Sequence, residues 1–179
     1  MEDTQGNRSD PSVRRRFEEV FLPHLDAAWN LSRWIMQNDE DAKDCVQEAF
    51  LRAYKAFPRF RQGDGRPWLM AIVRNVCYSA IKSARNRRKA EPFDEELHST
   101  GQAAGNSSFA ADTEMIDLAL GNLEPEFREV IVLHDMEGFS YREIAAVSGI
   151  PIGTVMSRLA RGREKLRIDL GRLSKGGNP

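Results

Sequence analysis

The sequence predicts an all-α fold: two small helical domains joined by a flexible linker, with a helix-turn-helix in the C-terminal domain. Apolar residues recur every three to four positions through most of the chain, and neither half alternates apolar and polar residues as strands do. Residues 90–113 lack this period and are rich in Gly, Ser, Ala and Thr, a composition typical of flexible linkers. Near the C-terminus, Gly149 and Pro151 separate two apolar-periodic runs, a pattern that indicates two short helices joined by a tight turn.

The N-terminal half is expected to form four helices. Pro58 ends the third helix, and the Gly-Asp-Gly sequence at 63–65 makes the turn before the fourth. Asn75 is a candidate break within that fourth helix. The expected helices cover 12–21, a segment that begins after Pro23, 41–57 and 67–88.

The C-terminal half is also expected to form four helices. Ser140 followed by Glu143 predicts a capping box that opens the third of these. Pro151 fits just ahead of the last helix or in its first turn, where its missing N–H is not needed. The expected helices cover 113–122, 124–136, 140–147 and 152–170, and a short helix within 90–113 stays open.

Composition excludes several classes of protein. The 179 residues are 41% hydrophobic and 30% charged, which is a globular profile. No apolar run is long enough to cross a membrane, and the first ten residues contain no apolar segment that could act as a signal peptide. We therefore expect a cytoplasmic protein that does not insert into membranes. The two cysteines, Cys45 and Cys77, are far apart in sequence, which favours buried free thiols over a metal site or disulfide.

The charges are unevenly distributed although the net charge is only −1. Residues 74–89 contain six basic residues and no acidic one, and residues 156–167 contain five basic residues and one Glu. The segment 90–113 between them has five acidic residues and no Lys or Arg. Two basic blocks separated by an acidic segment indicate two surfaces for an anionic partner.

The third expected helix, 41–57, has a charged face with one apolar residue in its middle. Its core side is predicted to consist of Ala42, Val46, Ala49, Phe50, Ala53 and Phe57. Leu51 falls instead among the charged residues Asp44, Glu48, Arg52 and Lys55. An exposed Leu is usually an ordinary feature of a protein surface. An apolar centre ringed by charges is also the composition of a small docking surface, and spacing alone leaves both interpretations open.

The fourth expected helix combines apolar, aromatic and basic residues. Trp68, Leu69, Ile72 and Val76 share one face, which is typical of core. Arg74 and the basic residues that follow it alternate with Asn75, Tyr78 and Ser79. Basic side chains bind phosphates, an amide can contact a base edge, and an aromatic ring can stack on an unpaired base. This mixture favours single-stranded or melted DNA, whereas a run of charges alone is more often a solvated face.

Residues 140–166 have the pattern of a helix-turn-helix. Ile144 and Ala145 pack the first helix, and Gly149 supplies the turn. One buried seam is expected on the second helix, formed by Ile152, Val155, Leu159, Gly162 and Leu166. The opposite side has Thr154, Ser157, Arg158, Arg161 and Lys165. Such a helix can enter a major groove, while the alternative is an ordinary helical hairpin with a solvated basic face.

Three segments in this order resemble the extracytoplasmic-function (ECF) sigma factors, the small two-domain class of bacterial sigma factors. They are DAKDCVQEAFLRAYKAF (41–57), RPWLMAIVRNVCYSAIKSARNRR (66–88) and LEPEFREVIVLHDMEGFSYREIAAVSGIPIGTVMSRLARGREKL (123–166). The resemblance covers nearly the whole chain except its ends and the linker. It implies an alternative sigma factor that binds core RNA polymerase and directs initiation by reading −35 and −10 promoter elements and melting DNA.

The resemblance also implies roles for individual residues. The face implied to bind the clamp helices of the largest polymerase subunit consists of Asp44, Gln47, Glu48, Leu51 and Arg52. The residues implied to recognise and melt the −10 element are Trp68, Arg74, Asn75, Tyr78, Ser79, Lys82 and Arg85. Asn75 occupies the position at which the family contacts a flipped-out base.

The second helix of the helix-turn-helix is implied to read the −35 element. Its implied DNA contacts are Thr154, Met156, Ser157, Arg158, Ala160, Arg161, Arg163 and Lys165. Ser157, Ala160 and Arg161 correspond to base-facing positions, and Arg158, Arg163 and Lys165 to phosphate contacts. Many relatives have a basic residue where this chain has Met156, so their −35 sequence is not transferable.

The implied domains are a disordered N-terminal tail (1–11), sigma region 2 (12–89), an acidic flexible linker (90–113), sigma region 4 (114–172) and a C-terminal tail (173–179). In the family the linker runs toward the RNA exit path. An anti-sigma factor that covers both domains is a further implied partner, beside core RNA polymerase and promoter DNA.

Two other classes of protein share some of these features. A stand-alone helix-turn-helix regulator would dimerise and bind duplex DNA without polymerase. A nuclease could use Asp39, Glu40, Asp41 and Asp44, but these acids cluster at a helix start, where they favour the helix dipole without any metal. The three histidines are scattered, with no triad or ligand spacing. The sequence therefore predicts no catalytic residue, metal or cofactor.

Overall fold

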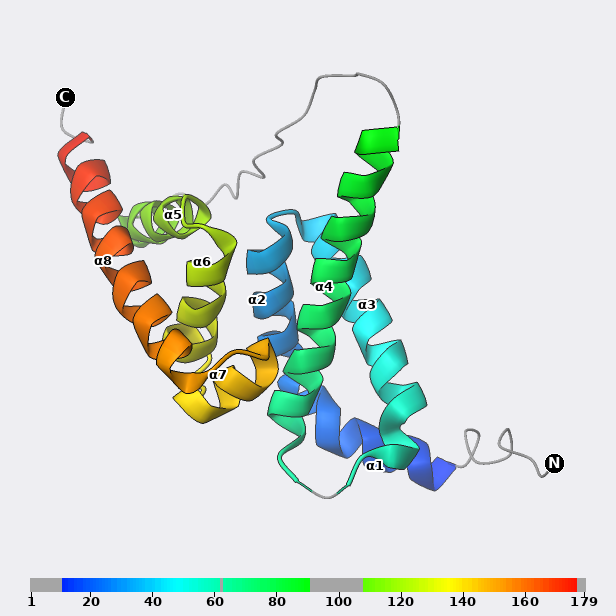
Figure 1. The fold of residues 1–179 in the computed structure, drawn as a ribbon. Helices are drawn as coiled ribbons and strands as arrows, with labels where there is room; N and C mark the ends of the chain where they lie inside the picture. Colours follow the sequence, from blue (N-terminus) through cyan, green and yellow to red (C-terminus); the bar gives the residue numbers. More distant parts are fainter. Residues whose placement is uncertain (1–10, 62, 91–107, 177–179) are drawn as a thin grey trace.

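A computed structural model describes residues 11–61, 63–90 and 108–176 of the chain. Every regular element in these ranges is helical (Figure 1). The elements are α1 (Pro11–Phe21), η2 (Leu22–His24), α2 (Leu25–Met36), α3 (Asp39–Ala56), η3 (Phe57–Arg59), α4 (Gly65–Ala90), α5 (Ser108–Gly121), α6 (Pro125–Ile131), η4 (Val132–Met136), α7 (Tyr141–Ser148) and α8 (Ile152–Gly176). The all-α expectation is therefore met, while most of the predicted acidic linker lies outside the described residues.

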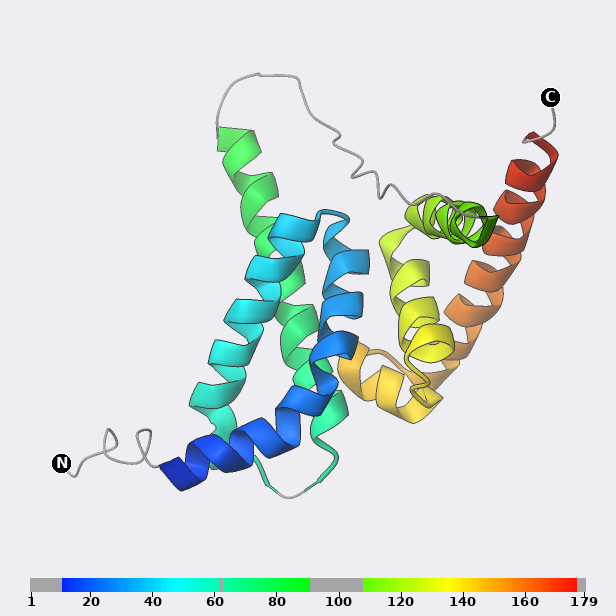
Figure 2. The same ribbon diagram turned by 180° about the vertical axis from the view of Figure 1, so that it is seen from behind.

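The first helical unit, α1–α4, packs α2, α3 and α4 side by side, and α1 lies across one end of the three (Figures 1 and 2). The side chain of Asn38 caps α3 by accepting a hydrogen bond from the backbone N–H of Asp41 at 2.9 Å. The predicted core side of α3 is correct, with Ala42, Val46, Ala49 and Ala53 buried. Near α1, aromatic rings pack edge to face and fill the space at that end of the unit.

The fourth helix, α4, is longer than expected and continuous. The sequence made Asn75 a candidate break, but helical hydrogen bonding runs through this residue from Gly65 to Ala90. Asn75 is exposed, so its amide does not compete with the backbone in a buried setting. Gly65 begins the helix where a Cβ would lie 2.8 Å from Cγ1 of Val20, which explains the absence of a side chain there. Because α4 has no break, its polar residues keep the helical spacing along its whole length.

The second helical unit, α5–α8, places α6 against α8 and ends α6 in a π turn. The sequence predicted one helix over 124–136, but regular α-helix stops at Ile131 and Val132–Met136 form the wider turn. The backbone N–H of Phe139 then bonds the carbonyl of Leu133 at 2.9 Å, and Phe139 is buried. This buried ring fixes the corner from which α7 begins, which the periodicity of the sequence did not reveal.

The turn between α7 and α8 forms as the sequence predicts. Ser140 and Glu143 make both hydrogen bonds of a capping box at the start of α7. Gly149 ends α7 with a φ of 67°, a left-handed conformation that favours glycine, and α8 begins directly after Pro151. Val155, Leu159 and Gly162 are buried on α8 as expected. Ile152 is 42% exposed, contrary to the predicted seam, because it is the first residue of the helix and precedes the turn that packs.

The two units pack against each other. Helices α2 and α4 of the first unit contact α6, η4 and α7 of the second, and α7 lies beside α4 in both views (Figures 1 and 2). Arg128 links the units from a buried position. Its guanidinium donates to the carbonyls of Leu120, Gly121 and Leu123 at the end of α5, and to the carbonyl of Trp34 in α2. Burial lowers the pKa of this guanidinium from its ordinary value. One cation thus meets the negative ends of two helices.

Candidate protein and nucleic-acid interfaces

The charged face of α3 is open to solvent. Leu51 is 55% exposed at its centre, and Glu48 and Arg52 beside it form an ion pair at 2.6 Å. Figures 1 and 2 show α3 on the side of the first unit that faces away from α6–α8. Asp44 and Gln47 are also exposed, so all the residues predicted for this face lie near the surface. An apolar side chain surrounded by charges at an unoccupied surface has the composition of a small protein-docking site.

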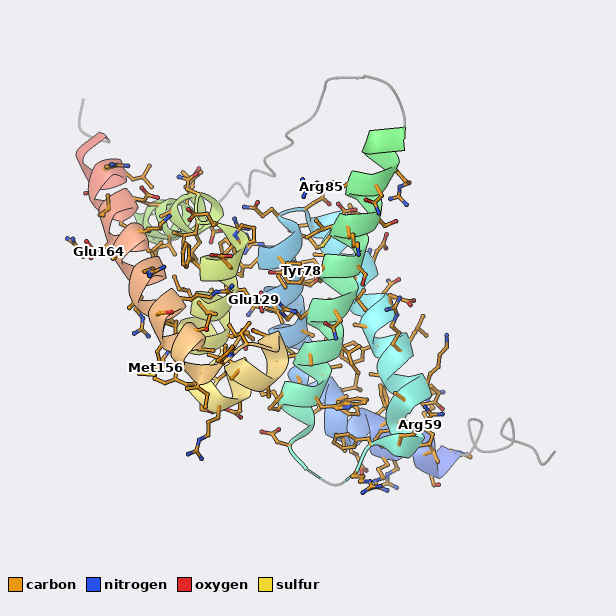
Figure 3. All side chains as sticks on the ribbon, in the orientation of Figure 1. Arg59, Tyr78, Arg85, Glu129, Met156 and Glu164 are labelled. Atoms are coloured by element: carbon orange, nitrogen blue, oxygen red, sulfur yellow. The ribbon has the colours of Figure 1, made fainter. Side chains whose placement is uncertain are left out.

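The outer half of α4 carries exposed polar residues at helical spacing. Ser79 and Lys82 line a shallow groove together with Ser83, Asn86 and Arg87. Asn75 and Arg85 are exposed on the same helix, and Figure 3 labels Arg85 near its free end. Spacing of three and four residues places the groove residues on one helix face, so hydroxyl, amide and basic groups occur together. Ser83 and Asn86 were not singled out from the sequence.

Trp68 lies at the other end of α4 and is partly buried. Its ring centroid is 5.2 Å from that of Phe21 and 5.0 Å from that of Phe60. The sequence made Trp68 both a core residue and a candidate for DNA contact. The aromatic packing accounts for the buried part of the ring, and the remaining surface is available to a ligand.

Arg74 and Tyr78, in the middle of α4, both bond Glu129 of the second unit, and Figure 3 labels Tyr78 and Glu129. Arg74 donates from Nε to Oε1 of Glu129 at 2.5 Å, and the Tyr78 hydroxyl donates to Oε2 of the same carboxylate at 2.7 Å. Ser148 at the end of α7 donates a third hydrogen bond to Oε1 at 2.7 Å. Burial raises the pKa of Tyr78, and the nearby Glu129 carboxylate raises it further. Arg74 and Tyr78, which are both predicted to contact DNA, therefore already have a hydrogen-bond partner within the chain.

Glu129 was not identified from the sequence. Its side chain is only 2% exposed although it is charged. A signal was present, because Glu129 directly precedes the apolar run VIVL in a segment that otherwise builds a core face. A charged residue at such a position is almost never fully buried unless it is paired. The identity of its partners on α4 could not be read from the sequence, since they depend on how the two units pack.

The polar side of α8 contains paired and unpaired cations. Arg163 donates to Asp135 at 2.5 Å, Lys165 donates to Glu124, and Arg158 lies 3.6 Å from Glu126. Within the described residues Arg161 has no ion-pair partner. The remaining predicted residues are Thr154, which is half-buried, and Met156, Ser157 and Ala160, which are exposed. Met156 is 52% exposed, and Figure 3 shows it on the outer side of α8.

A hollow of about 760 Å³ separates the basic sides of the two units. Arg74 and Tyr78 border it on α4, and Arg158, Arg161 and Lys165 border it on α8. Glu124, Glu126 and Glu129 of the second unit supply negative charge to the same space. The packing thus brings together two sets of basic residues that are far apart in the sequence, and it places acids between them.

The described residues also bear on metal binding, membrane insertion and thiol chemistry. These residues hold no group of three or more His, Cys, Asp or Glu side chains arranged to hold a metal ion. No described helix is both long and apolar enough to span a membrane. Cys45 and Cys77 are buried free thiols, and burial raises the pKa of Cys45 to about 12. A thiol with such a pKa is almost entirely protonated at neutral pH and reacts slowly.

Comparison with known proteins gives consistent matches. Residues 20–87 match the family described as Sigma-70 region 2, and residues 113–166 match Sigma-70, region 4. The chain is 34% identical over 164 residues to the ECF RNA polymerase sigma factor SigE of Mycolicibacterium smegmatis, covering 88% of this chain and 63% of that protein. It is 32% identical over 158 residues to the RNA polymerase sigma factor CarQ of Myxococcus xanthus, covering 88% of this chain and 90% of CarQ.

A solved structure matches the arrangement of the helices as well. The sigma factor RpoE of Bartonella quintana, crystallised with the anti-sigma factor NepR, superposes with a TM-score of 0.74 at 30% sequence identity. The match covers 88% of this chain and 98% of that one, so it includes both helical units.

Proposed function

We propose the following uses for the surfaces of this chain, which belongs to the ECF sigma factors of the sigma-70 family. As a member of that family it is a non-catalytic factor that directs promoter-specific transcription initiation by RNA polymerase. In the proposal, residues 12–89 act as sigma region 2, residues 114–172 as region 4, and residues 90–113 as the segment that connects them. The chain acts in the cytoplasm, where polymerase is found.

The open face of α3 is the proposed docking site for the clamp helices of core RNA polymerase. The observation that carries this assignment is the exposure of Leu51, 55%, within a ring of charges on a helix whose opposite side is fully used for the core. An apolar residue at the centre of a patch and charges at its rim are the arrangement of an interface hot spot. Asp44, Gln47, Glu48 and Arg52 supply that rim.

The polar residues of α4 are proposed to recognise and melt the −10 element. Asn75 offers an exposed amide to an unpaired base, and Ser79, Lys82 and Arg85 offer groups to the backbone. Arg74 and Tyr78 provide a cation and an aromatic ring, with the guanidinium 4.6 Å from the ring centroid. Trp68 contributes the uncovered part of its ring. Stacking and charge together suit single-stranded DNA.

Helix α8 is proposed to read the −35 element from the major groove. Ser157, Ala160 and Arg161 face the bases, Arg158, Arg163 and Lys165 bind phosphates, and Thr154 lies near the start of the helix. Arg161 supports this assignment because it is exposed and has no ion pair among the described residues. Met156 can contact a thymine methyl group but cannot bond guanine with two hydrogen bonds.

An anti-sigma factor is a further proposed partner. The support is the likeness to the Bartonella RpoE chain, which was crystallised with NepR. The partner of this chain would occupy surfaces that polymerase or promoter DNA use.

The test is co-elution of the purified chain with core RNA polymerase, beside a variant with Asp44, Glu48 and Leu51 all changed to Ala. Truncation of one hot-spot residue costs at least about 2 kcal/mol, which is about 30-fold, so we expect the triple variant to lose more than about 30-fold in affinity. A matched control changes Glu19, Leu22 and Asp26 to Ala, the same residue types at exposed positions elsewhere. Equal binding by the variant and the control would show that the α3 face is not the docking site.

A further inference from the structure

The start of α8 carries no charge. Residues 151–157 contain neither an acidic nor a basic side chain, and the cations of the helix begin at Arg158. In a helix-turn-helix the N-terminal residues of the second helix contact base edges, whereas contacts to phosphates position the protein without reading the sequence. The uncharged start of α8 is therefore the part of the helix whose contacts depend on the bases.

Two large apolar side chains are exposed on this uncharged start. Ile152 is 42% exposed and Met156 is 52% exposed. Side chains four residues apart on a helix are neighbours, so Ile152 and Met156 form one apolar edge. Figure 3 shows Met156 on the outer side of α8. Contact of this edge with another apolar group would remove it from water and would therefore be favourable.

The hydrogen-bonding side chains of the same segment have little to offer a base. Thr154 is half-buried. Ser157 donates its hydroxyl hydrogen to the carbonyl of Thr154 at 3.0 Å, within the helix. The Ser157 oxygen can still accept a hydrogen bond from a base, but it has no second hydrogen to donate. The apolar edge is thus the larger exposed feature at the start of α8.

Thymine is the base that matches an apolar edge. Its 5-methyl group is apolar, whereas the other groups that base pairs present in the major groove are hydrogen-bond donors and acceptors. We propose that Ile152 and Met156 together read thymine methyl groups in the −35 element. This assignment rests on the proposed −35 role of α8, and it adds Ile152 to the residues that determine specificity.

Arg161 follows Met156 in the next turn of α8 and offers different chemistry. Its guanidinium has hydrogen-bond donors, which match the O6 and N7 acceptors of guanine. Positions of two kinds are therefore expected in the −35 element. Some are read through methyl contacts near the start of α8, and another is read through hydrogen bonds from Arg161.

The experiment uses core RNA polymerase loaded with the full chain, and a promoter selected from a library with randomised −35 positions. Each thymine of the selected −35 element, on either strand, is replaced singly by uracil. Uracil lacks the 5-methyl group but keeps the hydrogen-bonding groups of thymine. The affinity of the loaded polymerase for each promoter is measured by competition in gel-shift assays. We expect at least one position at which uracil weakens wild-type binding about three- to fivefold, because one buried methyl group contributes about as much as one methylene.

Variants of the apolar edge connect this effect to the two residues. Met156→Ala should abolish the uracil effect at one position, and Ile152→Ala should reduce it at the same or the neighbouring position. Met156→Leu keeps an apolar side chain and should retain the effect. The matched control is Ile168→Ala, because Ile168 is 40% exposed on the same helix but lies several turns beyond the start. This control should keep the full uracil effect.

The outcomes separate this assignment from the proposed −35 role itself. A selected −35 preference without any uracil-sensitive position would overturn the assignment alone. An unchanged uracil effect in both Met156→Ala and Ile152→Ala would do the same, since the methyl group would then be read elsewhere. If the selected promoters show no −35 preference at all, the proposed −35 role of α8 fails, and the assignment fails with it.

Discussion

The outward face of α3 and the inner face of α4 belong to one helical unit but differ in how the chain treats them. The charges of α3 pair locally, as Glu48 does with Arg52 four residues later, and the Leu51 side chain is exposed to solvent. Arg74 and Tyr78 of α4 bond a carboxylate that lies more than fifty positions away in the sequence. One face is ready for a partner, and the other is already occupied.

The binding proposed for each face accounts for the difference. A docking face with a single apolar residue at its centre does not need polar partners within the chain, because one exposed apolar side chain is ordinary on a protein surface. A cluster of basic groups attracts any anion, and nucleic acid most strongly. An internal carboxylate lowers that attraction without removing the basic groups. A strongly basic surface can thus keep a low affinity for unwanted nucleic acid when an internal carboxylate pairs with its basic groups.

The largest expected effect comes from removing Arg128, the cation that is buried where the two units meet. Arg128→Ala removes a donor from four backbone carbonyls. The carbonyls of Leu120 and Gly121 keep a hydrogen bond, from the Leu123 N–H and the Gln37 side chain, and each buried carbonyl left unsatisfied costs about 1–3 kcal/mol. We expect the free energy of unfolding to fall by about 3–5 kcal/mol in urea titrations followed by circular dichroism. Arg161→Ala, an exposed change of the same type, should stay within about 0.5 kcal/mol of wild type. Similar losses for both would contradict the role of burial.

A smaller contrast exists within α8, between a glycine packed against α6 and a glycine that faces open space. At Gly162 a Cβ would lie 2.9 Å from Cδ1 of Ile131, whereas a Cβ at Gly171 would meet no neighbouring atom of the described residues within 4 Å, apart from its own helix backbone. Gly162→Ala is therefore expected to destabilise the fold by about 1–3 kcal/mol through overpacking. Gly171→Ala should stabilise it by about 0.5–1 kcal/mol, since alanine favours the helix. Thermal unfolding of both variants measures the two signs, and two changes of the same sign would refute the contrast.

The unpaired and paired arginines of α8 give the next test, in polymerase loaded with the sigma factor. Arg161→Ala should weaken recognition at one −35 position by about 1–3 kcal/mol if Arg161 reads a base. Arg158→Ala should weaken all promoters alike and reduce the salt dependence by about one ion. A panel of promoters with single −35 substitutions separates the two. An unchanged preference at every −35 position in Arg161→Ala would rule out base reading.

The smallest effect concerns an acid that pairs at the surface of the second unit. Hydrogen bonding from Arg163 holds the pKa of Asp135 below its ordinary value of 3.8. A depressed folded-state pKa stabilises the protein above the unfolded pKa, and this contribution is lost as the pH falls through the folded value. Asp135→Asn should cost less than about 1 kcal/mol at pH 7, because the pair is partly exposed. The stabilities of the variant and wild type should converge below pH 3.8, and a constant difference would exclude the pair as the cause.

Much of the fold could be predicted from local patterns. The apolar periods predicted each α-helix of the described chain, and the capping box at Ser140 is confirmed. The bounds were less accurate: α5 begins at Ser108, within the expected linker, α8 continues to Gly176, within the expected tail, and the short helices η2 and η3 were not predicted. Two local features differ from the expectation where tertiary packing decides. Helix α4 runs through Asn75 without a break, and the helix predicted over 124–136 reaches Met136 but finishes as a π turn, close to the buried Phe139. Ile152 was placed in a buried seam, but the helix has not yet met its neighbours at that residue.

Less of the candidate surfaces could be predicted from the sequence. Exposure of Leu51 could be predicted because helical spacing fixes which side faces out. The occupation of Arg74 and Tyr78 by Glu129 could not, because it joins two units whose relative placement leaves no periodic signal. The residue assignments for polymerase and promoter contacts, and the bounds of the domains, remain predictions.

Arg128 makes the contact between the units asymmetric. Three of its four acceptors, Leu120, Gly121 and Leu123, lie within its own unit, and only the Trp34 carbonyl lies in the other. The corner between α5 and α6 is thus braced from inside the second unit, and its shape depends little on the contact that Arg128 makes with α2.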